Sequence, residues 1–168
     1  MNNIGVVRKI DDLGRIVIPK EIRKTLNVRS GEDLQIFVDN ESIVLTKYNK
    51  LLNLQETAQK YIDSFSKLTS STILIVNHTN IVSSSNKNFI NKKLDSKVVK
   101  LISSRQVVLD KSFVIDSQVY DLNYYIMPLI INTDLIGAII ILSNNVINDR
   151  DKTLAEVLSI LLSDLIYA

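Results

Sequence analysis

The first 50 residues predict a small unit with four short strands and very little helix. Asp11-Asp12-Leu13-Gly14 marks a turn, because Gly14 can adopt a positive φ at no steric cost. Pro19 suits the first turn of a helix, where its missing N–H is not needed. The predicted strands cover residues 4–10, 15–18, 34–38 and 42–47, and the predicted helix covers residues 20–26. A unit this small buries too little apolar surface to be stable alone, so we expect it to dimerise.

A larger α+β region is predicted after this unit, with residues 48–50 as a linker. Its apolar residues follow helical spacing in some segments and strand-like alternation in others. Helices are predicted over residues 51–69, 95–103 and 151–166, and strands over residues 72–76, 81–84, 107–109, 113–115, 124–131 and 135–142. This order is typical of an antiparallel sheet with flanking helices.

Two of these helices carry wide apolar faces. In the first helix the apolar residues step by 4, 3, 4 and 3 positions, at Leu54, Ala58, Tyr61, Phe65 and Leu68. The last helix has a doubled leucine face. A helix that covers a sheet needs one apolar stripe, so the extra width favours pairing with further copies of the chain. The alternative is that both stripes belong to the intramolecular core.

The composition excludes several kinds of site. The chain has no cysteine, which rules out disulfides, thiolate metal sites and thiol nucleophiles. Its single histidine, His78, is predicted in an exposed turn. The acids of the larger region are scattered without metal-ligand spacing, among them Asp95, Asp110, Asp116 and Asp121. We therefore expect no enzyme activity, no metal and no cofactor.

Positive charge is concentrated at the N-terminal end. The net charge is only +2, but residues 1–29 hold seven bases and three acids, whereas from residue 51 onward eleven bases balance eleven acids. A cationic end of this kind is expected to meet a polyanion such as double-stranded DNA. The DNA-binding residues that we expect are Arg8, Lys9, Arg15, Arg23 and Lys24. Most of their contacts should go to phosphates and position the protein.

The N-terminal segment closely resembles the signature of AbrB-type regulators. The residues that carry this resemblance are Gly5–Leu26, followed by Leu34–Asp39 and Ile43–Leu45. The resemblance implies a swapped-hairpin dimer, in which strands of two chains interlace. It also implies that Arg8, Arg15 and Arg23 occupy DNA-contacting positions. Lys24 stands where relatives often have arginine, which leaves a phosphate contact but not a bidentate one.

The layout of the whole chain is similar to the stage V sporulation protein T family, in which a GAF-like domain follows the AbrB-type unit. The C-terminal part of the resemblance is carried by Ser71–Ile75 and Leu135–Ile140. It implies an AbrB-like DNA-binding domain over residues 1–50 and a GAF-like sensor and oligomerisation domain over residues 51–168. The expected protein is an activator or repressor of sporulation-type genes, a homotetramer, with room for an unidentified small-molecule effector.

Two alternatives have different consequences. An antitoxin of a toxin–antitoxin pair shares this DNA-binding fold, but its second part is usually a flexible tail. Residues 70–166 instead have the apolar pattern of a folded domain. An enzyme built on the C-terminal domain would need clustered catalytic groups, which the sequence does not offer. The longest apolar run, Leu135–Leu142, is too short to cross a bilayer. We therefore expect a cytoplasmic, nucleoid-associated protein with no membrane partner.

Overall fold

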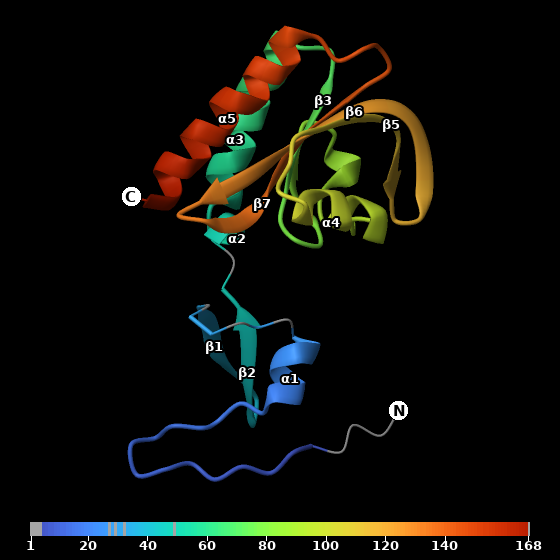
Figure 1. The fold of residues 1–168 in the computed structure, drawn as a ribbon. Coiled ribbons are helices and arrows are strands. Elements are labelled where there is room, and N and C mark those ends of the chain that lie inside the picture. Colours follow the sequence, from blue (N-terminus) through green and yellow to red (C-terminus); the bar gives the residue numbers. More distant parts are fainter. Residues whose placement is uncertain (1–4, 27, 29, 32, 49, 168) are drawn as a thin grey trace. The chain divides into compact units, whose positions relative to one another are not determined.

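The computed structural model describes residues 5–26, 28, 30–31, 33–48 and 50–167, which Figure 1 draws along the chain. The chain divides into two units, Met1–Tyr48 and Asn49–Ala168. Each unit holds its own antiparallel sheet, of two strands in the first and five in the second. The α+β fold class predicted from the sequence is confirmed.

The first unit begins with an extended arm that turns back on itself and leads into a short helix and a hairpin (Figure 1). The turn before Arg15 is confirmed, with Gly14 at a φ of +75°. The predicted helix is α1, Lys20–Thr25, and it begins directly after Pro19. The predicted hairpin consists of β1, Leu34–Asp39, and β2, Ser42–Lys47.

The two predicted N-terminal strands are wrong for the isolated chain. Residues 5–10 and 15–18 are not strands in the structure, and residue 4 lies outside the described residues. A strand needs a neighbouring backbone to pair with its N–H and C=O groups. The alternation of apolar residues therefore predicts an extended segment. It does not indicate which backbone segment would pair with it.

The described residues of the first unit have no buried side chain. Large apolar side chains that would form a core lie open to solvent instead, and Val7, Val17 and Val38 are 89%, 77% and 75% exposed. Monomeric proteins rarely leave so many large apolar side chains of one small unit open to solvent. The unit is therefore incomplete as a single copy.

The second unit is built on a sheet with the strand order β4-β3-β7-β6-β5, in which all neighbours are antiparallel. The strands are β3 (Thr72–Val76), β4 (Ile81–Ser84), β5 (Val108–Ile115), β6 (Gln118–Ile131) and β7 (Asp134–Ser143). The first two match the predicted ranges. The separate strands predicted at 107–109 and 113–115 form one strand, β5. A bulge at Ser112, where φ is 64°, lets the strand continue through the polar residues between the two predicted ranges.

Helices cover both faces of this sheet (Figure 1). On one face α3 (Gln55–Phe65) and α5 (Asp149–Tyr167) lie side by side over a core that includes Ile75 and Ile139. On the other face α4 (Ser96–Ser103) and the 3-10 turn η2 (Lys87–Phe89) pack over a second core that includes Leu74 and Ile140. Alternate residues of the central strands thus serve opposite cores.

The single helix predicted over residues 51–69 is wrong in detail. It is divided into α2 (Lys50–Asn53), α3 and a 3-10 turn, Ser66–Leu68, with a break at Leu54. Ala58 is buried as expected, but Tyr61 and Phe65 are half-buried against the first core, and Leu68 is 49% exposed. Most of this predicted seam therefore packs within the chain. On α5, the apolar side chains of Val157 and Ile160 are exposed.

Candidate nucleic-acid interface

The turn of the N-terminal arm is organised by one carboxylate. Asp11 Oδ1 accepts hydrogen bonds from the main-chain N–H groups of Leu13 (3.0 Å) and Arg15 (2.8 Å). Asp11 Oδ2 accepts one from Arg15 Nε at 2.8 Å. The main chain closes the same turn, since the Asp11 N–H donates to the Arg15 carbonyl oxygen. Asp11 thus fixes both the backbone and the guanidinium of Arg15.

These contacts also determine the charge of the turn. The hydrogen bond from the Arg15 main-chain N–H, followed by the one from its guanidinium, lowers the pKa of Asp11 below its ordinary value of 3.8. The Asp11 carboxylate therefore stays ionised at neutral pH. Its ion pair with Arg15 is lost only in acid, when the pH falls below the ordinary pKa of an aspartate. The Arg15 side chain remains 73% exposed, so it is held in place while open to a ligand.

All five predicted DNA-binding side chains are exposed in the structure. Arg8 and Lys9 are consecutive residues of the extended arm, and such neighbours point to opposite sides of an extended chain. Arg23 and Lys24 lie together in the last turn of α1. The structure thus places bases on the arm, at its turn and on the adjoining helix. Arg29, another base of this segment, lies outside the described residues.

Sequence reasoning missed the role of Asp11, which it treated as a turn residue. The spacing Asp11 to Arg15 across a turn that contains Gly14 was the available signal, since aspartate side chains often bond the main chain two residues ahead. It also missed the glutamines of α3, because a helical sequence does not reveal which sheet edge it will meet.

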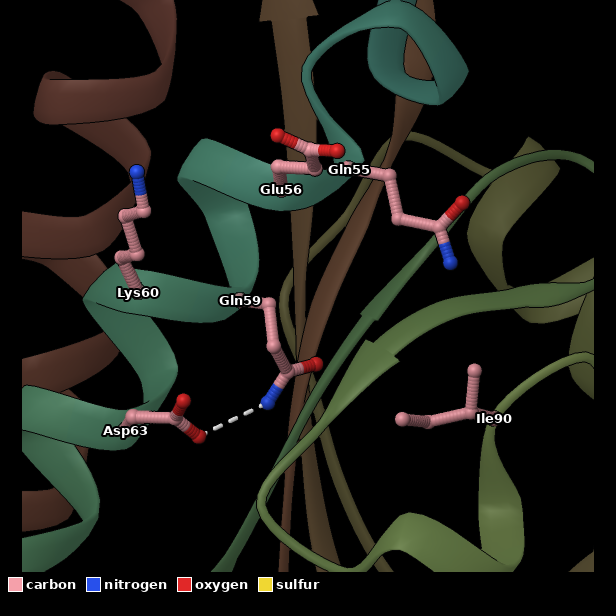
Figure 2. Close-up of a pocket in the computed structure, with 6 residues that line it drawn as sticks. All are labelled: Gln55, Glu56, Gln59, Lys60, Asp63 and Ile90. Atoms are coloured by element: carbon pink, nitrogen blue, oxygen red, sulfur yellow. Dashed lines mark hydrogen bonds between the residues drawn. The ribbon is translucent and has the colours of Figure 1, made fainter.

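A groove of about 390 Å³ lies between α3 and Ile90 in the second unit, and Figure 2 shows Gln55 and Gln59 pointing from α3 toward β4. Gln55 Nε2 donates to the Val82 carbonyl oxygen at 3.0 Å. Gln59 Nε2 donates to the Ser84 carbonyl oxygen at 3.0 Å, while its Oε1 accepts from the Ser84 N–H at 3.1 Å. The two amides therefore satisfy backbone groups on the outer edge of the sheet.

Side chains of η2 and α4 cover one face of the sheet in the second unit. Phe89 of η2 and Val98 and Ile102 of α4 are buried there against the second core. Among the described residues, no three His, Cys, Asp or Glu side chains group in a way that would hold a metal ion. No helix of the described residues is long and apolar enough to span a membrane.

Comparison with known proteins defines both parts of the chain. Residues 53–164 match the family described as stage V sporulation protein T C-terminal, transcription factor, and residues 7–52 match the family described as antidote-toxin recognition MazE, bacterial antitoxin. Stage V sporulation protein T of Bacillus subtilis (strain 168) is 35% identical over 166 residues, which cover 94% of this chain and 90% of that protein. The transition state regulatory protein AbrB of the same organism is 46% identical over 59 residues, 35% of this chain and 62% of AbrB.

The fold of the second unit has a solved counterpart. The GAF domain of an Acinetobacter phosphoenolpyruvate-protein phosphotransferase superposes with a TM-score of 0.55 at 10% identity, over 70% of this chain and 87% of that one. Fold and sequence together define a DNA-binding transcription regulator with an AbrB-type N-terminal unit and a GAF-like domain. Its similarity to one relative along almost the entire chain favours this class over an antitoxin. The chain belongs to the stage V sporulation protein T family.

Proposed function

We propose that this protein regulates sporulation-type genes, as activator or repressor, by binding double-stranded DNA as a dimer of interlaced N-terminal units. Residues 1–50 form the DNA-binding domain, and residues 51–168 form the GAF-like domain that assembles dimers. The protein acts in the cytoplasm, on the nucleoid. The proposed function is regulatory and includes no catalysed reaction.

The observation that carries the dimer is the exposed apolar surface of the first unit. A second copy would cover side chains such as Val17 and Val38 and would supply backbone partners for residues 5–10 and 15–18. Sedimentation of residues 1–50 tests this. We expect a folded dimer at micromolar concentration, and a folded monomer would contradict the proposal.

DNA binding through Arg8, Lys9, Arg15, Arg23 and Lys24 is tested by its salt dependence. If a dimer neutralises roughly 6–8 phosphates, log K should fall with log salt with a slope of about −5 to −7. Arg15→Ala and Arg23→Ala should weaken binding and make the slope less steep. Lys67→Ala removes an exposed base from the other unit and serves as the control. Binding that ignores salt, or that Arg15→Ala leaves unchanged, would overturn the assignment.

We also propose that α3 and α5 join two dimers into a tetramer. The supporting observation is the exposed apolar surface of α5, where Ile160 is 61% exposed and Val157 38% exposed. Ile160→Asp should yield dimers in light scattering without unfolding the chain. Val146→Asp, in an exposed loop, is the matched control. Phe65→Asp is a poorer probe, since Phe65 packs against the first core. A tetrameric Ile160→Asp protein would contradict this assembly.

An effector is the remaining part of the proposal. A small molecule that binds the GAF-like domain would change DNA affinity, and the groove in Figure 2 is one opening through which it could reach α3. Thermal-shift screening of cell metabolites, followed by DNA binding with each hit, tests it. If no compound stabilises the domain and a cell extract leaves DNA binding unchanged, the domain serves assembly alone.

A further inference from the structure

The balanced charge of the second unit conceals a strongly basic segment. Residues 86–105 hold six bases and one acid, a net charge of +5 in 20 residues. We call these six side chains the basic layer: Lys87, Lys92, Lys93, Lys97, Lys100 and Arg105. None of the ion pairs that the structure shows among its described residues involves a member of the basic layer. Ion pairs within the described part of the chain therefore do not neutralise its charge.

Five members of the basic layer lie on the elements that cover the second core, η2, α4 and the segment between them, and Arg105 follows the end of α4. Phe89, Val98 and Ile102 anchor these elements in the core. Lys97 and Lys100 are exposed and three residues apart, so they lie on the same outward side of α4. Lys87, Lys93 and Arg105 are exposed as well, while Lys92 places its Nζ 5.9 Å from the centre of the Phe89 ring. Buried anchors thus hold these cations on a fixed support.

The acid within the segment has a structural task. Asp95 Oδ1 accepts a hydrogen bond from the Lys97 main-chain N–H at 2.8 Å and caps α4. The opposite side of the sheet has the reverse balance, since residues 55–68 and 149–167 together hold six acids and four bases. The helices and segments that cover the two faces of the sheet therefore carry net charges of opposite sign, and one further carboxylate, that of Asp116, meets the basic side, where its Oδ1 accepts a hydrogen bond from the Lys93 main-chain N–H at 3.0 Å. Interspersed solubilising charges would not produce this separation.

We propose that the basic layer is a second DNA-contact surface, which binds phosphates of the duplex next to the segment held by the N-terminal unit. The inference rests on the proposed DNA binding of that unit. Lysines act as point charges that suit a sequence-independent phosphate contact. The five lysines are distributed over η2, α4 and the segment between them instead of converging on one point, which fits a row of phosphates better than one small anion. Attachment to a DNA-binding unit also raises the local concentration of the duplex.

Matched double variants of the full-length protein test this surface. Lys97→Gln with Lys100→Gln removes two charges from the basic layer. Lys67→Gln with Lys111→Gln removes two exposed charges that lie outside the basic layer and outside α3 and α5, and serves as the control. Circular dichroism and light scattering establish that both variants fold and assemble like the parent. Each protein is titrated with a short duplex that covers only the site of the N-terminal unit, and with one that extends roughly two helical turns further on each side.

The expected result depends on duplex length. On the long duplex the basic-layer variant should show a log K against log salt slope that is less steep by about 0.9 for each phosphate that the variant no longer neutralises. On the short duplex it should bind like the parent, and the control should match the parent on both. A parental slope on the long duplex would overturn the inference, and capture of an acidic protein by the basic layer in that case would assign it to a protein partner. Failure of the parent to bind even the short duplex would overturn the proposed function and this inference together.

Discussion

Gly137 of β7 lies against the main-chain carbonyl oxygen of Val76 at the end of β3. A Cβ atom at position 137 would overlap that oxygen and would lie 2.9 Å from Cδ1 of Leu51, a fully buried side chain. The central strand pair of the sheet and the first turn of α2 therefore meet at a point where no side chain fits.

Gly137→Ala should destabilise the second unit by about 2–3 kcal/mol, because the carbonyl group of Val76 is held by the sheet and cannot move aside as a flexible side chain would. The free energy of unfolding in urea, followed by circular dichroism, measures this. Gly5→Ala is the matched control, since nothing lies within 4 Å of its added methyl group. Equal stability of the two variants would contradict the close approach.

Asp151 ties the start of α5 to the segment that leads into β3. Its side chain is buried, and it accepts hydrogen bonds from Thr69 Oγ1 at 2.6 Å and Ser71 Oγ at 3.1 Å. Asp151→Ala should cost about 1–3 kcal/mol of unfolding free energy, because it leaves hydroxyl groups without their acceptor. Asp151→Asn keeps one oxygen and should cost less. Asp149→Asn, at a 96% exposed side chain two residues earlier, should stay within about 0.5 kcal/mol of the parent.

Tyr124 should make the second unit sensitive to alkaline pH. Burial, followed by the charge of Asp110 and its hydrogen bond at 3.3 Å, raises the pKa of the Tyr124 hydroxyl from 10.0 to about 12. The folded state holds this proton more tightly than the unfolded chain. Its contribution to stability is therefore complete below pH 10 and is lost as the pH rises to about 12, a difference of about 3 kcal/mol.

Unfolding free energies measured across that pH range check the prediction. Tyr124→Phe should flatten the alkaline decline, and Asp110→Asn should remove the smaller, charge-dependent part of it. Parallel curves for the parent and Tyr124→Phe would show that the buried hydroxyl contributes nothing to the alkaline transition.

Asp11 provides a test of whether charge or geometry dominates at the arm. A view based on charge alone predicts that removal of any acid near phosphates strengthens DNA binding. Because Asp11 organises the turn and Arg15, we expect Asp11→Ala to weaken binding by roughly threefold to tenfold. Asp11→Asn retains an oxygen for the main-chain N–H groups and should bind at least as tightly as the parent. Asp12→Asn is the charge-matched control, and tighter binding by Asp11→Ala and Asp12→Asn alike would refute the organising role.

Local patterns in the sequence were sufficient for elements whose partners are near in the chain. The hairpin of Leu34–Lys47 follows from alternation around a polar turn, and Asn40 indeed adopts a positive φ of 52° there. The continuity of β5 through Ser112 could not be predicted, since a bulge and a turn present similar polar residues. The break at Leu54 was likewise hidden, because the apolar spacing of the helix continues through it.

The candidate site was predictable in its residue types but not in its organisation. Clustered bases in the first 29 residues indicated Arg8, Arg15 and Arg23, and these are exposed as a phosphate contact requires. The basic layer was missed because charge was summed over the entire second region. A running sum over 20 residues would have found it.

The bonds from Gln59 to Ser84 have a consequence for how the chain can be cut. They occupy backbone N–H and C=O groups at the edge of β4 that would otherwise be free to hydrogen-bond with a strand of another molecule. A protease that cleaves before residue 50 leaves Gln55 and Gln59 in place. It releases a fragment in which these side chains still cover the edge of the sheet. Cleavage after Phe65 that frees α3 would expose that edge, and the remaining fragment would be prone to aggregate through strand-to-strand pairing. The helix α3 thus protects the second unit from aggregation as well as forming part of its fold.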